Sequence, residues 1–404
     1  MLSMLDDIRN AREMLRGVIH RTPLDYSSTF SRLTGCNIYL KMECFQKTGS
    51  FKVRGAYTRL RMLGSEERRR GVVTASAGNH AQGVAYASRM LNIPCTVVMP
   101  FNASPAKVSA TRMYGAEIVF HGSIYDQAWE RAMEIAREQG RVFVHAFDDA
   151  NVIAGQGTIG LEIMEDIPDI DAIVVPVGGG GLAAGIALAV KGIRPDVKII
   201  GVQSKAFSAM KESLEQGRIV EVSNGSTIAD GISVRKPGEL TLSILRRYMD
   251  HIDTVDDDAI VKAMFLLMER AKVVVEPAGA VGLAYMLNTP DANLRGKNIA
   301  VVLSGGNVDM FLLGQIVHKG LVGIGRLIRI SVQLVDRPGE FKRVVDTIAA
   351  SRVNIVDVIH DRLGQDVRVG NAKVILSLEA EDMEHAERLM RMLREQGIRY
   401  ELLT

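Results

Sequence analysis

Short runs of β-branched residues alternate with longer amphipathic stretches over about the first 320 of the 404 residues. The stretches between the runs, for example residues 80–91 and 259–272, place apolar side chains at helical spacing. Strands that alternate with helices predict βαβ units and a parallel sheet covered on both faces, which is an α/β fold. Because about 320 residues are too many for one core, we expect two lobes with a cleft between them, the smaller comprising about residues 48–148. The predicted strands are residues 71–74, 95–99, 117–120, 142–146, 172–177, 197–202 and 298–303.

The pattern changes after Arg326. Residues 327–335 alternate apolar and polar side chains, which is typical of a half-buried strand. Helical and strand-like stretches then follow in an order that completes a βαββαβ unit, which predicts a ferredoxin-like small domain. We therefore expect a first domain over residues 1–320, a linker over 321–326 and the small domain over 327–404. The later predicted helices lie around residues 341–348 and 386–393, and the later predicted strands are residues 355–359, 374–378 and 398–403.

The composition excludes several classes of protein. Lysine and arginine number 49 against 47 acidic residues, so the net charge of +2 gives no electrostatic footprint for nucleic acid or an anionic membrane. The three cysteines, Cys36, Cys44 and Cys95, show no CxxC spacing, which argues against a disulfide framework and a structural zinc site. The N-terminal residues carry charges throughout and lack the apolar core of a signal peptide. We expect a cytoplasmic protein.

Residues 172–190 are uncharged and mostly apolar, and their number is close to that of a membrane span. Pro176 and the four glycines at 178–181 interrupt this stretch, with β-branched residues before them and an Ala/Leu-rich segment after them. A strand, a glycine loop and a buried helix explain this pattern better than a membrane span. We expect no interaction with a membrane.

The glycine loop at 178–181 is suited to an anion, because backbone without Cβ atoms approaches a ligand closely and the following helix presents its N-terminus. A tight turn packed against another segment is the structural alternative, but it does not need four glycines. A dinucleotide is disfavoured because the next strand ends in Gln203 and Ser204, where an acid is required for the ribose. The chain also lacks the GxxxxGK[ST] motif of a P-loop. A cofactor with one phosphate remains favoured.

Two further polar loops follow predicted strands, at residues 75–80 and 304–307. Open α/β sheets bind ligands at the carboxyl ends of their strands. Taken alone, each loop is better explained as a capped turn, but three such loops in one chain favour a ligand site. Lys52 lies in a run of small residues, and an amine that forms a Schiff base needs a lowered pKa in a partly dry site. Spacing alone does not distinguish Lys52 from the other lysines.

Four motifs together resemble those of the threonine/serine dehydratases, which have the second fold type of pyridoxal-phosphate enzymes. They are Ser-Phe-Lys-Val-Arg-Gly-Ala, Ser-Ala-Gly-Asn-His-Ala-Gln-Gly, the four glycines and Ser-Gly-Gly-Asn, in this order. The resemblance covers residues ~5 to ~320. The tail resembles an ACT domain with residues 336–339 as its first turn, and the arrangement resembles the threonine ammonia-lyases of intermediate length. It implies pyridoxal 5'-phosphate as cofactor and the conversion of threonine to 2-oxobutanoate and ammonia, or of serine to pyruvate.

The resemblance also implies a role for each motif. Lys52, beside Phe51, would bind the cofactor as a Schiff base and then act as the general base. Asn79 would contact the 3-hydroxyl of the ring, and Ser304 would face the pyridine nitrogen. The phosphate would be bound by Gly178, Gly179, Gly180, Gly181 and the amide of Leu182. The substrate, and in particular its carboxylate, would be bound by Ser76, Ala77, Gly78, Asn79 and His80, with Ser76 as a catalytic candidate.

Departures from the relatives narrow the function. Serine racemases carry a second serine where this chain has Ala77, so racemisation is not expected as a main activity. They also place an acid for a divalent cation where this chain has Gln203, so we assign no metal site. Two alternatives remain open: a β-replacement synthase with the same cofactor, and an amino-acid sensor in which the tail is the working part.

The ACT-like tail predicts regulation by a small amino acid, because such domains often pair and bind effectors at the shared edge. Isoleucine or valine is the expected effector if the enzyme serves isoleucine biosynthesis, and we expect a homo-oligomer, either a dimer or a tetramer. The segment 320–325 is equally well explained as a hinge or as a plain connector. Threonine and serine both remain possible substrates, because one methyl group is worth only ~1–3 kcal/mol in a pocket.

Overall fold

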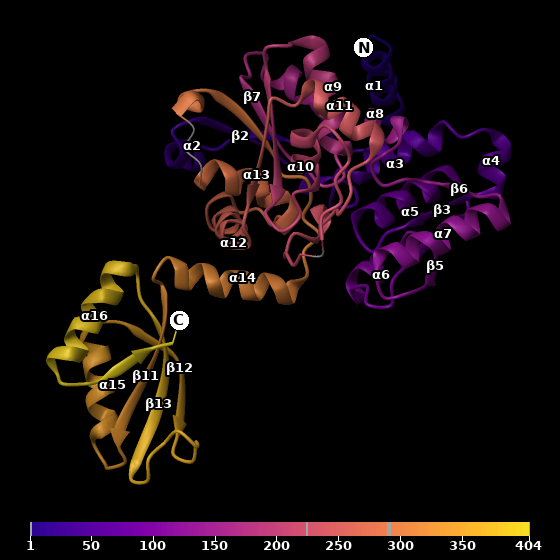
Figure 1. Ribbon diagram of the computed structural model, residues 1–404. Coiled ribbons are helices and arrows are strands. Elements are labelled where there is room, and N and C mark those ends of the chain that lie inside the picture. The colour runs from indigo at the N-terminus through magenta and orange to yellow at the C-terminus, as the bar shows by residue number, and fades with distance from the viewer. Residues whose placement is uncertain (1, 224, 289–291, 404) are drawn as a thin grey trace. The chain divides into compact units, whose positions relative to one another are not determined.

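The computed structural model describes residues 2–223, 225–288 and 292–403. The chain divides into two compact units, residues 1–309 and 310–404, which are described separately below (Figure 1). The helix α14, Met310–Gly323, belongs to the second unit. The segment 321–326, which we predicted as a linker, therefore begins inside a helix, because the apolar spacing of this stretch continues to its end.

The larger sheet of the first unit has six strands in the order β1-β2-β10-β7-β8-β9. β1 is antiparallel to β2, and the other neighbours are parallel. Ile173 and Val175 pack with the helices α8 and α9 in one core, whereas Val174 faces the helix α13, where Gly282 approaches it. The predicted parallel sheet covered on both faces is thus confirmed. The strands are β1 Leu24–Tyr26, β2 Asn37–Lys41, β7 Ala172–Pro176, β8 Lys198–Ser204, β9 His251–Val255 and β10 Asn298–Val302.

A second, smaller sheet in the same unit has four parallel strands in the order β5-β4-β3-β6. Alternate side chains again face two layers of helices: Val72 and Val97 pack with α3 and α5, and Val73 and Val98 pack with α7. All four strands come from the part of the chain that we assigned to the smaller lobe. They are β3 Val72–Ala75, β4 Cys95–Met99, β5 Glu117–Phe120 and β6 Val142–Phe143.

The helices of the first unit connect the strands in the predicted alternation. The stretch 259–272 is interrupted, since α12 ends at Leu266 and a π-helical turn, Leu267–Ala271, follows it. In the described residues no helix is long and apolar enough to cross a membrane. The α-helices are α1 Leu2–Leu15, α2 Ser28–Thr34, α3 Lys52–Arg61, α4 Ser65–Arg70, α5 Asn79–Leu91, α6 Pro105–Met113, α7 Tyr125–Gln139, α8 Ala150–Asp166, α9 Gly181–Ile193, α10 Ala209–Gln216, α11 Glu239–Tyr248, α12 Asp257–Leu266 and α13 Pro277–Asn288.

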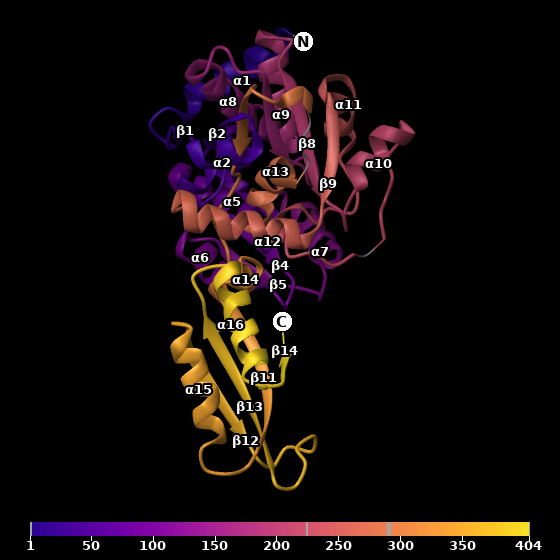
Figure 2. The ribbon, with the colours of Figure 1, turned by 90° about the vertical axis from the view of Figure 1, so that its left-hand side faces the viewer.

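The second unit contains an antiparallel sheet in the order β12-β13-β11-β14, with α15 and α16 on one face (Figure 2). Ile330 and Val332 point to that face and pack with Val344 of α15 and Leu389 of α16. The predicted βαββαβ order and its ferredoxin-like fold are confirmed. The elements are β11 Leu327–Val335, α15 Glu340–Ala350, β12 Asn354–Asp361, β13 Asn371–Glu379, α16 Met383–Glu395 and β14 Tyr400–Leu402.

A buried group of charges anchors α3 to the larger sheet and to α8. Arg54 on α3 is fully buried, and its guanidinium donates hydrogen bonds to Glu43 at 2.7 and 2.9 Å and to Glu162 at 2.6 and 3.0 Å. The ammonium of Lys41, at the end of β2, also donates to Glu162 at 2.6 Å. Burial alone would lower the pKa of Arg54, but the two carboxylates raise it above its ordinary value. Two cations thus balance two carboxylates inside the protein.

The substitution Arg54→Met should destabilise the protein by ~3–5 kcal/mol, because it leaves a buried carboxylate charge without its partner. Thermal and urea unfolding of the purified protein measure this loss. Arg9→Met is a suitable control, since Arg9 pairs with Asp6 at the surface and both side chains are more than half exposed. The control should lose less than ~1 kcal/mol, and an equal loss in the two variants would contradict the role assigned to Arg54.

Candidate functional site

The loop before α3 and the loop after β10 are joined by their backbones. Ser50 and Gly305 form an isolated antiparallel bridge, and the amide of Phe51 donates to the carbonyl of Ser304 at 3.1 Å. Lys52 begins α3 directly after this contact. The structure therefore places two of the predicted motifs, around Lys52 and Ser304, next to each other.

The amine of Lys52 lies in a largely dry environment. Its Nζ donates to the carbonyl of Ala146 at 3.0 Å and lies 5.1 Å from the ring centroid of Phe51. Burial lowers the pKa of Lys52 to about 8, and the charge of Glu276 acts in the opposite direction. A substantial fraction of the amine is therefore neutral near pH 8, where it can act as a nucleophile or as a base.

The four glycines follow β7, as predicted, and the fourth of them, Gly181, begins α9. Gly180 has a φ of +98°, a conformation that L side chains rarely adopt. A Cβ at Gly179 would lie 2.5 Å from the ring of Phe147, and one at Gly180 would lie 2.7 Å from a methyl of Met210. The loop thus requires glycine both for its conformation and for the close approach of its neighbours.

The N-terminus of α9 is suited to an anion. Its N-cap residue is Gly180, which has no side chain to accept a hydrogen bond from the first amides of the helix. Those amides are available to a ligand, and the helix dipole favours a negative charge there. Because Phe147 contacts the glycine loop and neighbouring Ala146 accepts from Lys52, one short segment links the amine to this helix end.

The loop after β3 leads into α5 in a similar way. The Ser76 hydroxyl accepts a hydrogen bond from the amide of Gly78 at 3.1 Å, and α5 begins at Asn79 without a side-chain cap. Residues 76–79, including Ala77, are half-buried. His80 differs, because its ring is buried with Nε2 at 3.0 Å from the carbonyl of Val144. Burial lowers the pKa of His80 to about 3, so the ring is neutral at physiological pH.

The structure adds two residues that we did not assign to the site, Glu276 and Asn307. Asn79 donates through Nδ2 to Glu276 at 2.7 Å, and it accepts through Oδ1 from the Nδ2 of Asn307 at 2.9 Å. Two signals in the sequence were available: Glu276 is the only acid in the apolar run 273–282, and Asn307 ends the Ser-Gly-Gly-Asn motif.

Glu276 is only 3% exposed. Burial raises the pKa of Glu276 to about 7, and the charge of Asp230 adds to this rise. The pKa of this carboxyl group is lowered in part by the charge of Lys107, by the hydrogen bond from Asn79 and by the charge of Lys52. A buried carboxyl group that titrates near neutral pH beside a buried amine is a common feature of functional sites.

Gln203, which stands where the serine racemases carry an acid for a divalent cation, hydrogen-bonds within the protein. Gln203 is buried, and its Oε1 accepts from the amide of Lys211 at 2.8 Å. Within residues 2–223, 225–288 and 292–403, no group of three or more His, Cys, Asp or Glu side chains is arranged to hold a metal ion.

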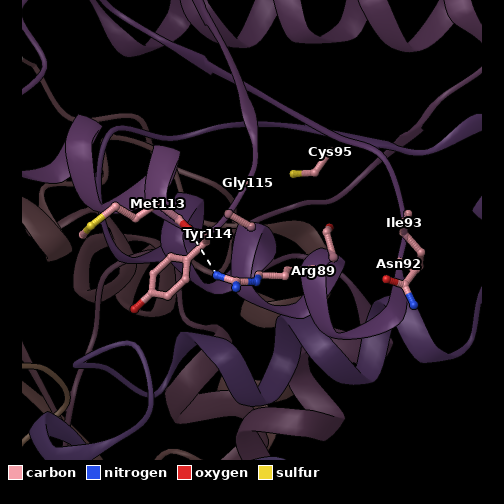
Figure 3. Close-up of a pocket in the computed structure, with 9 residues that line it drawn as sticks. Arg89, Asn92, Ile93, Cys95, Met113, Tyr114 and Gly115 are labelled. Carbon is pink, nitrogen blue, oxygen red and sulfur yellow. Dashed lines mark hydrogen bonds between the residues drawn. The ribbon is translucent and has the colours of Figure 1, made fainter.

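A surface pocket of about 320 Å³ lies where α5 and α6 end (Figure 3). Arg89 donates across it to the carbonyl of Met113 at 3.3 Å. Cys95 also lines it, but burial raises the pKa of its thiol to about 12, so the thiol stays protonated. The described residues that line this pocket include none of those predicted for the site.

The arrangement fits a ligand with one phosphate and an aldehyde, together with a substrate that carries a carboxylate. Two helices, α5 and α9, present uncapped N-termini after β3 and β7, and each can bind an anion. The amine of Lys52 donates to the carbonyl of Ala146, and the backbone of the preceding residue, Phe51, is joined to the loop after β10. An amine of lowered pKa is the group that reacts with an aldehyde.

Comparisons with known proteins agree with this chemistry. The family model described as pyridoxal-phosphate dependent enzyme matches residues 15–305. An L-threonine ammonia-lyase of Thermotoga maritima is 49% identical over 393 residues, which are 97% of this chain and 98% of that protein. A catabolic L-threonine dehydratase of Escherichia coli is 45% identical over 313 residues, 77% of this chain and 95% of its own. The structure of a processed threonine deaminase from Solanum lycopersicum matches with a TM-score of 0.76 and 37% identity, covering 80% of this chain and 88% of that one.

The lowered pKa of Lys52 predicts its reactivity. As the pH rises through about 8 the amine loses its proton, so its reaction with an aldehyde should accelerate and reach a plateau well below the range of an ordinary lysine. Reductive methylation of the cofactor-free protein at a series of pH values, followed by peptide mass spectrometry, measures this. The exposed Lys47 in the same region is the internal reference. A Lys52 rate that still rises above about pH 10 would contradict the assignment.

Proposed function

The chain belongs to the family of pyridoxal-phosphate-dependent enzymes, and we propose that it is a threonine ammonia-lyase that converts L-threonine to 2-oxobutanoate and ammonia. L-Serine would give pyruvate by the same reaction. One observation carries the proposal: Lys52, whose pKa is lowered, directly follows the backbone contact between Phe51 and Ser304 in a chain that is 49% identical to an L-threonine ammonia-lyase over nearly its full length.

The residues present fit the cofactor. The phosphate is assigned to the amides of residues 178–182, where Phe147 and Met210 leave no room for a Cβ on the loop and no side chain caps the helix. The aldehyde is assigned to Lys52, whose pKa is lowered to about 8. We assign the ring oxygen to Asn79 and the pyridine nitrogen to Ser304. A neutral serine there leaves the ring a weaker electron sink, which suits rapid elimination.

Pyridoxal phosphate supplies an aldehyde for the substrate amine and a ring that withdraws electrons from the Cα–H bond. Ser76 and the first amides of α5 hold the substrate carboxylate at the helix N-terminus. Lys52 would take the Cα proton at Nζ as general base, which its lowered pKa permits near neutral pH. Loss of the β-hydroxyl as water and hydrolysis of the released enamine yield the keto acid and ammonia.

Two other functions predict different results. A β-replacement synthase needs a second nucleophile, whereas elimination needs none. An amino-acid sensor would bind its ligand through the second unit without using the cofactor, which leaves the buried amine and both uncapped helix ends without a role.

The purified protein with pyridoxal phosphate should release one ammonia for each keto acid formed, both with L-threonine and with L-serine as substrate. Lys52→Ala should reduce the rate roughly thousandfold, because the variant lacks both the attachment point and the base. The exposed Lys47→Ala is the control and should leave the rate unchanged. Turnover of threonine by Lys52→Ala at the wild-type rate, or a strict need for an added nucleophile, would overturn the proposal.

The proposal includes regulation through the second unit, with isoleucine or valine as effector. Its sheet has β12 as an edge strand, and Val356, Val358 and Ile359 on that strand are more than two-fifths exposed. An edge with unpaired backbone and exposed apolar side chains is suited to pairing with a second copy, which supports a homodimer or tetramer. A cytoplasmic location is supported by the buried thiols of Cys44 and Cys95, neither of which forms a disulfide.

Isoleucine or valine should change the rate of threonine turnover by the full chain, by roughly fivefold or more. A protein that ends at Asp309 should keep basal activity but lose this response. The family match ends at residue 305, and the Escherichia coli relative matches over only 77% of this chain, which supports a catalytic part that stands alone. An equal response in the two proteins would contradict the regulatory role.

A further inference from the structure

We propose that Glu276 is a positioning residue, which fixes the side-chain amide of Asn79 so that one Nδ2 hydrogen is presented to the ring oxygen of the cofactor. The inference rests on the proposed function, because it assumes that pyridoxal phosphate occupies this site. The two ends of an asparagine side-chain amide have nearly the same shape, but the oxygen accepts hydrogen bonds and the nitrogen donates them. The orientation of Asn79 therefore has to be set by its neighbours.

The direction of the hydrogen bonds follows from groups that can only accept. The Nδ2 of Asn307 donates to the backbone carbonyl of Thr48 at 2.7 Å, and a carbonyl cannot donate. The amide of Asn307 therefore has one orientation, with its NH2 group also facing Asn79. That contact requires the oxygen end of Asn79 to face Asn307.

The hydrogen bond between Asn79 and Glu276 requires the same orientation of the Asn79 amide. In its ionised form Glu276 only accepts, so it requires the NH2 end of Asn79, whose Nδ2 lies 2.7 Å from its Oε1. The amide of Asn79 is thus held from both sides, by a donor at Oδ1 and an acceptor at Nδ2. Removing either neighbour leaves the orientation set from one side only.

Asn79 has one hydrogen left for a ligand. Its Nδ2 carries two hydrogens, of which Glu276 accepts one. Across the described residues the second hydrogen has no protein acceptor, and Asn79 is half-buried at the start of α5. It is therefore available to an oxygen of a bound molecule.

Glu276 is itself held in place by the loop that carries Ser304. Its backbone amide donates to the carbonyl of Gly305 at 2.9 Å, and its carboxylate occupies the space that a Cβ on Gly305 would fill. Glu276 is buried, and a buried carboxyl group lowers stability unless it has partners. In this site its side-chain hydrogen bond goes to Asn79.

Two substitutions separate positioning from packing. Glu276→Gln keeps an oxygen that can accept from Asn79, whereas Glu276→Leu removes the acceptor and keeps a similar volume. Asn79→Ala removes the donor itself and is the reference for complete loss of the contact. The measurements are the dissociation constant of pyridoxal phosphate from each apoprotein, the absorption band of the bound cofactor, and the Tm of each apoprotein.

Glu276→Leu should weaken cofactor binding about tenfold and shift the absorption band in the same direction as Asn79→Ala. Glu276→Gln should stay within about threefold of the wild type and keep its band. The double variant Asn79→Ala/Glu276→Leu should bind no more weakly than Asn79→Ala alone, because the two residues act through one contact. If Glu276→Leu does not fold, Asn307→Leu disrupts the same chain of bonds from its other end and should give the same shift.

Wild-type affinity and an unchanged band in Glu276→Leu would overturn the inference, as would losses that add in the double variant. A lower apoprotein Tm with an unchanged band would assign Glu276 to packing alone and would also overturn it. The proposed function fails separately: it is refuted if the wild-type protein binds no pyridoxal phosphate. Binding by the wild type with no effect of Glu276→Leu refutes only the positioning role.

Discussion

The backbone contact between residues 49–51 and residues 304–306 is the interaction on which the site depends. The amide of Phe51 donates to Ser304, and the amide of Gly306 donates to Gly49 at 2.8 Å. Gly49 has a φ of +70°, a conformation suited to glycine. This contact joins the start of α3, which packs on the smaller sheet, to the end of β10 in the larger sheet. The position of Lys52 is therefore determined by both sheets of the unit.

The same helix shows two outcomes of burying a cation. Arg54 lies between two carboxylates that offset its burial, so its pKa rises and it stays charged. Lys52 hydrogen-bonds to a neutral carbonyl, and burial lowers its pKa to about 8. Arg54 and Lys52 are two residues apart in the sequence. The charge of Arg54 is balanced by the two carboxylates, whereas the amine of Lys52 loses its proton near pH 8. This difference comes from the partners that each side chain meets, because Arg54 faces two carboxylates and Lys52 faces a carbonyl group.

Local signals made much of the fold predictable. β4 and β5 have the predicted bounds because β-branched residues fill them, and the glycine loop was recognisable because its residue type is itself the signal. The strands β1, β2 and β9 were missed, since they are short or contain polar residues such as Asn37 and Asp253. The contact of Glu276 with Asn79 joins residues 197 positions apart, and no local pattern encodes such a pair.

Lys52 and Glu276 are best understood as one electrostatic unit. Burial drives each toward its neutral form, raising the pKa of the carboxyl group to about 7 and lowering that of the amine to about 8. Each charge opposes that effect on the other group, because opposite charges stabilise one another where water is excluded. Between these two values both groups are partly charged, so a proton is gained or lost at either group at modest cost. In the proposed reaction Lys52 accepts a Cα proton near neutral pH, and Asn79 and the loop at 304–306 hold in place the carboxyl group whose charge acts on this amine.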